Sequence, residues 1–442
     1  MGLGLPAPVD LDDLLEPFAR RGVDLGLDRL AGALAAGGHP ERRFAAVQVA
    51  GTNGKGSICT LLAAILAEAG LPYGVYRSPH LLSWCERLQL GNRWITPAEL
   101  RADLGRWRPL ASAFNLTPFE LLTAAAFDRL AAEAVQLAIL EVGLGGRLDA
   151  TTLHPDRRVI GLATIGLDHC EYLGSSLAAI AFEKAGVFQP GAIAISAPQE
   201  PAVAAVLADQ ARRVGTELRW VEPLRPQALG GPRLGLAGDL QRRNGAVAVA
   251  MAQALGQQGW GIEAGAIERG LALARWPGRL EIRSYRGKPL LLDGAHNPPA
   301  AIALRQELDQ GELAPWGAGG RRWLIGIQRH KQGAAMLRAL LAPGDQAAIT
   351  PLPEHASWSA AELAVACPEL ASQLRPVADP VAGLAWLHPL LGPEPEPGAG
   401  ELASPEEGGS GETGAALPVV AGSLYLLGAL IPWLDPAAAG PG

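Results

Sequence analysis

Lysine, cysteine and long apolar runs are all scarce in this chain of 442 residues. The four cysteines, Cys59, Cys85, Cys170 and Cys367, form neither a CxxC pair nor a metal-like cluster, so we expect free thiols in a reducing compartment, the cytoplasm. No run of 18 or more apolar residues occurs, and the N-terminus lacks the charged start and apolar core of a signal peptide. We therefore expect neither a membrane span nor a secretory signal.

Basic charge is limited as well. The net charge is -7 and the pI about 5.7, so there is no global basic field and nucleic acid is not an expected partner. Any anionic ligand must be met by a local site. The only lysines are Lys55, Lys184, Lys288 and Lys331, and every other basic residue is arginine. The few lysines are therefore candidates for positions that need a compact, chemically modifiable amine.

Short apolar runs alternate with helical stretches along the first part of the chain. Strands without polar alternation, separated by helices, predict a parallel sheet that is covered on both faces. Thr96 and Thr117 each precede a proline and are followed three residues later by glutamate, which predicts two capped helix starts. The expected strands are 44–50, 73–77, 137–142, 159–165 and 192–196, and the expected helices include 57–69, 117–134 and 176–185.

A second alternating series begins near residue 280. Its expected strands are 290–293, 323–327, 346–350 and 417–422. Trp276-Pro277-Gly278 breaks the pattern between the two series. We therefore expect two α/β domains, a doubly wound P-loop domain over 1–276 and a smaller Rossmann-like domain over 277–442. Residues 392–414 are rich in Pro, Glu, Gly and Ser and are expected to form a flexible inserted loop.

The segment Gly51-Thr52-Asn53-Gly54-Lys55-Gly56-Ser57 runs from an expected strand into an expected helix. Glycines let backbone N–H groups turn around phosphate oxygens, and the lysine and the helix N-terminus add positive charge. Ser57 can place a hydroxyl on Mg²⁺. The alternative is a glycine-rich turn without a ligand. Gly56 separates the lysine from the serine, which departs from the common Walker spacing.

Three further polar positions follow expected parallel strands, as the phosphate loop does. Ser78 follows the strand ending at residue 77, Glu141 lies near the end of the next strand, and His169 follows the strand 159–165. Ligands of open α/β sheets bind at this edge, and oxygen donors suit Mg²⁺. Each residue also has a structural interpretation: Ser78 as a turn residue, Glu141 as a structural carboxylate and His169 as a hydrogen-bonded histidine.

Several short sequence motifs follow one another along the chain. They are GTNGKGS at 51–57, SPH at 78–80, EVGLGGRLDAT at 141–151, LDH at 167–169, EKAG at 183–186, GDLQRRN at 238–244, WPGRLE at 276–281, DGAHNP at 293–298 and GSLY at 422–425. Together they resemble the Mur ligase superfamily and, within it, the dihydrofolate synthase/folylpolyglutamate synthase branch. The resemblance covers nearly the whole chain, and the string at 141–151 is specific to the folate branch.

The resemblance implies a nucleotide and metal site. The expected ATP contacts are Asn53, Gly54, Lys55, Gly56, Asn244, Arg279 and Asp293, where Asn244 would meet the base, Arg279 the phosphates and Asp293 the ribose. Ser57, Ser78 and Glu141 would hold one Mg²⁺. His169 and a carbamylated Lys184 would hold a second, since a carbamate supplies anionic oxygens that an ammonium lacks. The alternatives are an ordinary surface lysine at 184 and a strand-end turn at 293–296.

The resemblance also implies a folate side. Asp24, Leu25 and Gly26 resemble a segment of enzymes that accept dihydropteroate. The other implied substrate contacts are Thr117, Pro118, Phe119 and Glu120, together with Leu148, Asp149 and Ala150. Phe119 could stack on a pterin, although 117–120 also serves as a plain capping box. Lys331-Gln332 replaces the family's more usual Lys-Asp pair, which puts one contact of the second domain in doubt.

The implied activity is ATP-dependent ligation of L-glutamate to 7,8-dihydropteroate and to tetrahydrofolate polyglutamates through an acyl phosphate. Lys55, Lys184 and His169 are the expected catalytic residues. The expected partners are small molecules only, and the protein is expected to be a monomer. The alternatives are a synthase of polyglutamates alone, a Mur-type ligase of another substrate, and a P-loop binding protein without catalysis. Catalysis needs Glu141, His169 and Lys184 to converge near the loop, and the ligase interpretation fails if they lie beyond metal-bridging distance of Ser57.

Overall fold

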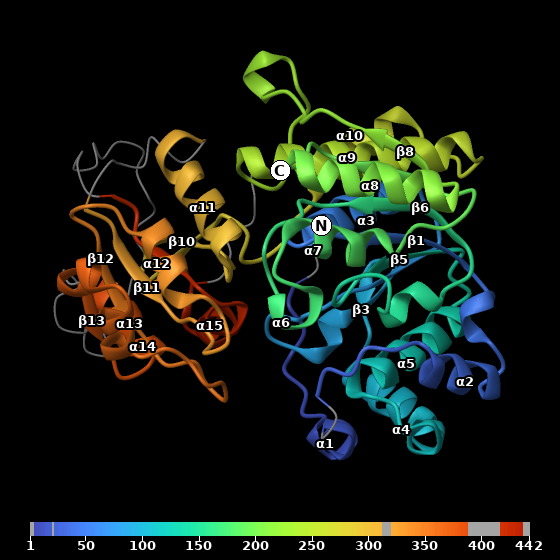
Figure 1. The fold of residues 1–442 in the computed structure, drawn as a ribbon, viewed down its shortest axis with the longest axis horizontal. Coiled ribbons are helices and arrows are strands. Elements are labelled where there is room, and N and C mark those ends of the chain that lie inside the picture. The colour runs from blue at the N-terminus through green and yellow to red at the C-terminus, as the bar shows by residue number, and fades with distance from the viewer. Residues whose placement is uncertain (1–3, 20–21, 312–319, 388–415, 436–442) are drawn as a thin grey trace, which may run out of the picture. The chain divides into compact units, whose positions relative to one another are not determined.

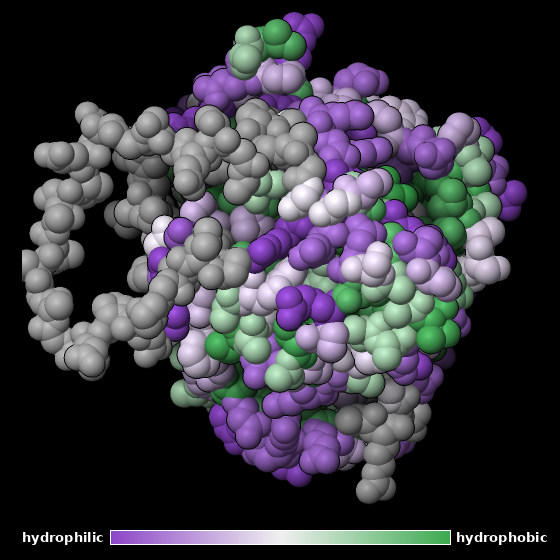
Figure 2. Space-filling model, turned by 90° about the vertical axis from the view of Figure 1, so that its left-hand side faces the viewer, coloured by the Kyte–Doolittle hydropathy of each residue, from purple (hydrophilic) through white to green (hydrophobic). Residues whose placement is uncertain are grey.

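A computed structural model describes residues 4–19, 22–311, 320–387 and 416–435. The chain divides into two compact units, Met1–Trp276 and Pro277–Gly442 (Figure 1). The inserted loop expected at 392–414 lies outside the described residues. In the described part of the chain, no helix is both long enough and apolar enough to cross a membrane. On the face shown in Figure 2, hydrophilic residues surround smaller apolar areas, as is usual for a protein surface.

The first unit is built on an eight-stranded sheet in the order β4-β3-β2-β5-β1-β6-β7-β8. Six strands are parallel, and β3 and β4 form an antiparallel edge. The five expected strands are present, with ends that differ by one to three residues. The sequence pattern missed β3 and β4, which are very short, and β8, which is half exposed. The strands are β1 Ala45–Ala50, β2 Tyr73–Tyr76, β3 Leu88–Leu90, β4 Arg93–Trp94, β5 Leu137–Glu141, β6 Arg157–Leu162, β7 Ile193–Ser196 and β8 Glu217–Trp220.

Helices cover both faces of this sheet (Figure 1), which explains why every residue of β1 is buried. Val47 and Val49 point to a core shared with α3 Lys55–Glu68, α9 Asp239–Gln257 and α10 Ala264–Leu273. Ala46 points to the opposite core. The helices on that opposite face are α1 Asp12–Ala19, α2 Asp28–Ala36, α4 Pro97–Phe114, α5 Pro118–Ala132, α6 Cys170–Leu173, α7 Leu177–Ala185 and α8 Pro201–Val214. Short 3-10 turns are η1 Pro40–Arg42, η2 Trp84–Arg87, η3 Ala150–Leu153 and η4 Gln227–Leu229.

The second unit has a six-stranded sheet in the order β13-β12-β11-β14-β10-β9. Only the edge strand β9 runs antiparallel to its neighbour. Its strands are β9 Glu281–Tyr285, β10 Lys288–Leu292, β11 Arg322–Ile325, β12 Gln346–Ile349, β13 Leu374–Pro376 and β14 Val419–Ala421. Its helices are α11 Pro298–Gln310, α12 Gly333–Leu340, α13 Ala360–Ala366, α14 Pro380–Leu387 and α15 Leu424–Leu430, with η6 Pro368–Gln373 and η7 Ile431–Trp433.

Both expected helix starts are confirmed. Thr96 and Thr117 are N-caps whose hydroxyls accept from the backbone N–H of Glu99 and Glu120, and each glutamate bonds back to the N-cap backbone. This reciprocal pairing satisfies two of the N–H groups that a helix start leaves without partners. The two starts fix where α4 and α5 begin, and α5 carries the folate segment expected from the sequence.

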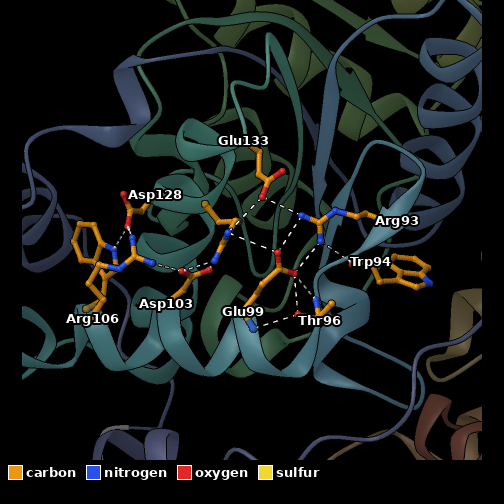
Figure 3. Close-up of polar contacts among 10 residues, drawn as sticks. Arg93, Trp94, Thr96, Glu99, Asp103, Arg106, Asp128 and Glu133 are labelled. Carbon is orange, nitrogen blue, oxygen red and sulfur yellow. Dashed lines mark hydrogen bonds and ion pairs between the residues drawn. The ribbon is translucent and has the colours of Figure 1, made fainter.

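A charged cluster joins α4 to α5 (Figure 3). The buried Asp103 accepts from Arg129 at 2.8 Å and 2.9 Å and also pairs with Arg106. Burial raises the pKa of Asp103, and the bond from Arg129 opposes that effect. Further out, the partly exposed Glu133 pairs with Arg93 at 2.9 Å. Asp103 is therefore the central acid of the cluster, because both arginines converge on it.

Replacing Asp103 tests this arrangement. We expect Asp103→Ala to lower the free energy of unfolding of the first unit by about 3 kcal/mol, because it removes the buried acceptor of Arg129 and leaves that guanidinium only its more exposed partners Glu99 and Glu133. The control Glu133→Ala removes two partly exposed pairs, with Arg93 and Arg129, and should cost less than about 1 kcal/mol. Urea unfolding followed by circular dichroism measures both. Equal, small losses in the two variants would contradict the central role of Asp103.

Candidate functional site

The phosphate loop connects β1 to α3, and two of its glycines adopt backbone conformations that other residues rarely reach. Gly51 has φ 140° and Gly54 has φ 99°. A β-carbon at Gly51 would lie 2.6 Å from the side chain of Ala163. A β-carbon at Gly54 would collide with the side-chain oxygen of Asn244. Glycine is therefore required at both positions, by conformation and by space.

The loop is held by the connection that follows β6. Thr52 donates its backbone N–H to Thr164 O at 2.8 Å. Its hydroxyl donates to Gly166 O at 3.0 Å and accepts from Gly166 N at 3.1 Å. The loop is thus fixed before any ligand arrives, and the first turn of α3 follows it directly. The N–H groups of such a turn lack helical partners and favour an anion.

Two lysines converge on one carbonyl of this loop. Lys55 Nζ donates to Gly51 O and Thr52 O, each at 3.2 Å. Lys184 Nζ, from the last turn of α7, donates to Gly51 O at 2.8 Å and is buried. The pKa of Lys184 is lowered to about 7, first by burial and then by the charge of Lys55, against the opposing effect of Asp168 and Asp149. Two amines at a glycine-rich loop fit a polyanionic ligand such as a nucleoside triphosphate.

The strand-end residues gather at the same edge of the sheet. Glu141 ends β5 beside Val49 of β1, and it is buried and raises the pKa of Cys59 in α3, second to burial itself. Tyr76 of β2 lies beside Leu140, which places the following Ser78 near Glu141. Ser57 is buried in the first turn of α3. The hydroxyl and carboxylate oxygens are of the kind that Mg²⁺ prefers.

His169 also lies at this edge, after β6. It is the N-cap of α6 with φ 51°, and its backbone N–H bonds to the carboxylate of the buried Asp168 at 3.0 Å. Asp168 acts on Lys184 electrostatically, so it belongs to the same neighbourhood, although the sequence argument did not single it out. Among the described residues, no three or more His, Cys, Asp or Glu side chains form a ready metal cluster. A cation here would depend on serine hydroxyls, on the Glu141 carboxylate and on ligand oxygens.

Asn244 lies in α9 with its side chain against Gly54 of the phosphate loop. Its amide nitrogen donates to Gln241 Oε1 at 3.0 Å, and it is buried. The sequence interpretation assigned it to the nucleotide base. The geometry brings its side chain to the phosphate loop itself, so the assignment to the base stays a prediction.

The segments expected on the folate side meet through Arg29. Its side chain binds Glu120 with two contacts of 3.2 Å. The same guanidinium donates to the backbone oxygen of Asp24 at 2.6 Å and pairs with the Asp24 carboxylate at 3.1 Å. The segment of Asp24, Leu25 and Gly26 is therefore tied to the capping box of Thr117, Pro118, Phe119 and Glu120, from which it is far in sequence.

Phe119 and the 141–151 string also lie together. A β-carbon at Gly143 would lie 2.6 Å from the Phe119 ring, and Tyr76 stacks on that ring at 6.1 Å. The buried Asp149 accepts from the backbone N–H groups of Gly143, Leu144 and Thr151, each at 3.0 Å. Asp149 thus organises the loop that carries Leu148 and Ala150. Direct contact of Leu148, Asp149 or Ala150 with a substrate stays a prediction.

In the second unit, Asp293 follows β10. Its carboxylate accepts from Leu280 N at 3.0 Å and from Ala295 N at 2.9 Å. Burial raises its pKa, and the charge of Arg279 opposes that effect. A β-carbon at Gly294 would collide with the Arg279 guanidinium, so Arg279 lies directly over this turn. Asp293 therefore has the strand-end role considered above, and nucleotide contact by Asp293 or Arg279 stays a prediction.

Gln332 occupies the N-cap of α12 and makes no side-chain capping bond. An aspartate at an N-cap accepts a hydrogen bond from the first turn of its helix. Gln332 supplies no such bond to α12.

The fold and the loop define a P-loop α/β nucleotide-binding protein with a second α/β unit. Residues 279–394 match the family model described as dihydrofolate synthetase, C-terminal domain. The dihydrofolate synthetase of Saccharomyces cerevisiae is 31% identical over 355 residues, which cover 74% of this chain and 81% of the relative. The chain therefore belongs to the dihydrofolate synthase/folylpolyglutamate synthase family, a family of ligases that form carbon–nitrogen bonds.

Solved structures agree with this assignment. Escherichia coli FolC, in complex with DHPP and ADP, has a TM-score of 0.80 at 26% identity and covers 97% of this chain and 98% of its own. The bifunctional folylpolyglutamate synthase/dihydrofolate synthase of Yersinia pestis, complexed with AMPPNP and a manganese ion, has a TM-score of 0.78 at 27% identity. That match covers 97% of this chain and 99% of its own.

The role of Gly54 in the phosphate loop can be tested by a substitution that adds one methyl group. We expect Gly54→Ala to weaken ATP binding by at least about tenfold, because it forces a left-handed backbone onto alanine and displaces Asn244. The control Gly105→Ala adds a methyl group to open space on helix α4, so it should leave the affinity unchanged. Isothermal titration calorimetry gives both dissociation constants. Unchanged affinity in folded Gly54→Ala protein would show that the loop does not hold the nucleotide.

Proposed function

We propose that this protein uses ATP to join L-glutamate to 7,8-dihydropteroate and to extend tetrahydrofolate with further glutamates. The observation that carries the proposal is the convergence of Lys55 and Lys184 on the Gly51 carbonyl. It gathers two amines at a loop built for phosphate, next to Glu141 at the end of a neighbouring strand. Membership of the ligase family, and its relatives' complexes with adenine nucleotides, support the same conclusion.

The chemistry is amide formation in two steps. A substrate carboxylate attacks the γ-phosphorus of ATP, the bond to the β-phosphate oxygen breaks, and ADP leaves behind an acyl phosphate. The amine of glutamate then attacks the acyl carbon, and phosphate departs as the amide forms. Lys55 and the N–H groups of the α3 start neutralise the phosphate charge and position it. Because an acyl phosphate hydrolyses in water, the site must exclude solvent while both steps proceed.

A divalent cation fits the oxygen donors of the loop edge. Ser57, Ser78 and Glu141 would hold one Mg²⁺, which would neutralise charge on the phosphate oxygens when bound. A second would rest on His169 and on Lys184 as a carbamate. The buried position of Lys184 supports this, since its amine lies at the loop, where it donates to Gly51 O at 2.8 Å. An amine beside Lys55 repels a cation, whereas its carbamate attracts one.

The remaining nucleotide contacts would come from Asn244, Arg279 and Asp293, as the family pattern implies. Asn244 at Gly54 supports this for the first unit. We place the protein in the cytoplasm, which its four free cysteines support. We also propose that it acts as a monomer on small molecules, without nucleic acid or membrane.

The acceptor substrate can be settled with purified protein, ATP and glutamate. We expect ADP release with 7,8-dihydropteroate and also with tetrahydrofolate, because the tie of Arg29 to Asp24 and Glu120 holds the dihydropteroate segment in place. Arg29→Gln should lower the rate with dihydropteroate at least about tenfold, as expected when a buried charge loses its partner. Arg212→Gln, an exposed control, should change neither rate. Turnover of tetrahydrofolate alone would instead assign a polyglutamate synthase.

Carbamylation of Lys184 has its own measurement. Protein equilibrated with ¹³C-bicarbonate should show a carbamate carbonyl signal in ¹³C NMR, and Lys184→Arg should lose it together with ligation, because a guanidinium does not form this group. Lys288→Arg, an exposed lysine of the second unit, should keep both the signal and the activity. Full ligation by Lys184→Arg would disprove the carbamate.

A further inference from the structure

Gly56, the residue that sets this loop apart from the common Walker spacing, has a specific neighbour. Its φ is not among the positive values that require glycine, so the reason for glycine there is space. A β-carbon at Gly56 would lie 3.2 Å from the indole nitrogen of Trp276 and 3.4 Å from Cζ2. The indole therefore lies directly against the first turn of α3, which follows the phosphate loop.

The indole of Trp276 also meets a buried arginine. Arg77 Cζ lies 4.6 Å from the Trp276 ring centroid and 5.4 Å from that of Trp94. Its side chain is 2% exposed, and Nη2 donates to Gln89 Oε1 at 2.7 Å. A guanidinium between two indole rings and away from water gains more from each ring than an exposed one does. Arg77 and Gly56 thus both contact the indole of Trp276.

Arg77 is itself anchored at the site. It directly follows β2 and precedes Ser78, and its backbone N–H donates to Arg87 O at 2.9 Å. Burial lowers its pKa, while the nearby Cys59 and Glu141 act in the opposite direction. Its guanidinium therefore belongs to the same charged neighbourhood as the proposed metal ligand Glu141. Its Nε is buried without a hydrogen-bond partner in the described structure, so the aromatic rings and Gln89 carry its position.

We propose that Trp276 is a positioning residue for the nucleotide, that its contacts with Arg77 and Gly56 form a clamp on the phosphate loop, and that Gly56 is glycine because no larger residue leaves room for the indole. The clamp fixes the first turn of α3, where Lys55 and Ser57 lie on either side of Gly56. Trp276 is also the last residue of the first unit. The residue from which the chain leads into the second unit is thus in direct contact with the phosphate loop. This inference rests on the proposed nucleotide site.

The test is a compensation experiment on the full chain, with Mg-ADP as the probe. Gly56→Ala should raise the dissociation constant of Mg-ADP about tenfold, as a contact of 3.2 Å forces the indole or the loop to move. Adding Trp276→Phe to Gly56→Ala should recover most of that affinity, because the smaller ring frees the space. Trp276→Ala alone should weaken binding about tenfold through loss of the Arg77 contact, and Arg77→Gln should act in the same direction.

A spectroscopic readout separates positioning from general stability. Mg-ADP should change the tryptophan fluorescence of the wild type, and Trp276→Phe should remove that change, while Trp220→Phe, an exposed tryptophan of the same unit, should retain it. Additive losses in the Gly56→Ala/Trp276→Phe double variant would overturn the clamp, as would unchanged affinity in Trp276→Ala. Should Trp276→Ala fail to fold, the double variant decides. Wild-type protein that binds Mg-ADP without ligating glutamate would overturn the proposed function alone.

Discussion

The carbonyl oxygen of Gly51 is the atom on which the candidate site depends. It accepts from Lys55 and from Lys184, which come from the two helices on opposite faces of the sheet. The left-handed glycines of the loop turn that oxygen toward both amines, and Thr52 locks the turn against the connection after β6. Without this acceptor, the two like charges of Lys55 and Lys184 would repel each other with nothing to offset the repulsion, and α7 would lose the hydrogen bond that Lys184 donates to the loop.

Much of this arrangement could be predicted from the sequence, because its signals are local. A glycine-rich loop between a strand and a helix can be recognised from its own residues. Parallel strands bring their carboxyl ends to one edge of the sheet, so Glu141 and Ser78 could be expected beside the loop. The capping boxes at Thr96 and Thr117 could be predicted equally well, because their pattern lies within four consecutive residues. The short edge strands β3 and β4 were missed because two or three residues carry no periodicity.

Other parts could not be predicted, because they are contacts between residues far apart in the chain. The sequence around Arg29 does not indicate its ion pair with Glu120, and the sequence around Gly56 does not indicate its contact with Trp276. Asp149 shows a different difficulty, since its carboxylate binds three N–H groups of its own loop. The sequence suggested Asp149 as a substrate contact, but in the structure its carboxylate holds the shape of the loop. The same double use holds at Glu120, which caps α5 and also binds Arg29.

The packing of Trp276 on Gly56 has a consequence for the order in which the protein is made. Domains form as units during synthesis, beginning at the N-terminus. The phosphate loop leaves the ribosome early, but the residue that presses on its first helical turn is the last of the same unit. The loop is therefore translated early, but its packing is completed only when Trp276 has been synthesised. A nascent chain that stops short of Trp276 contains the phosphate-loop motif without the indole that packs on it.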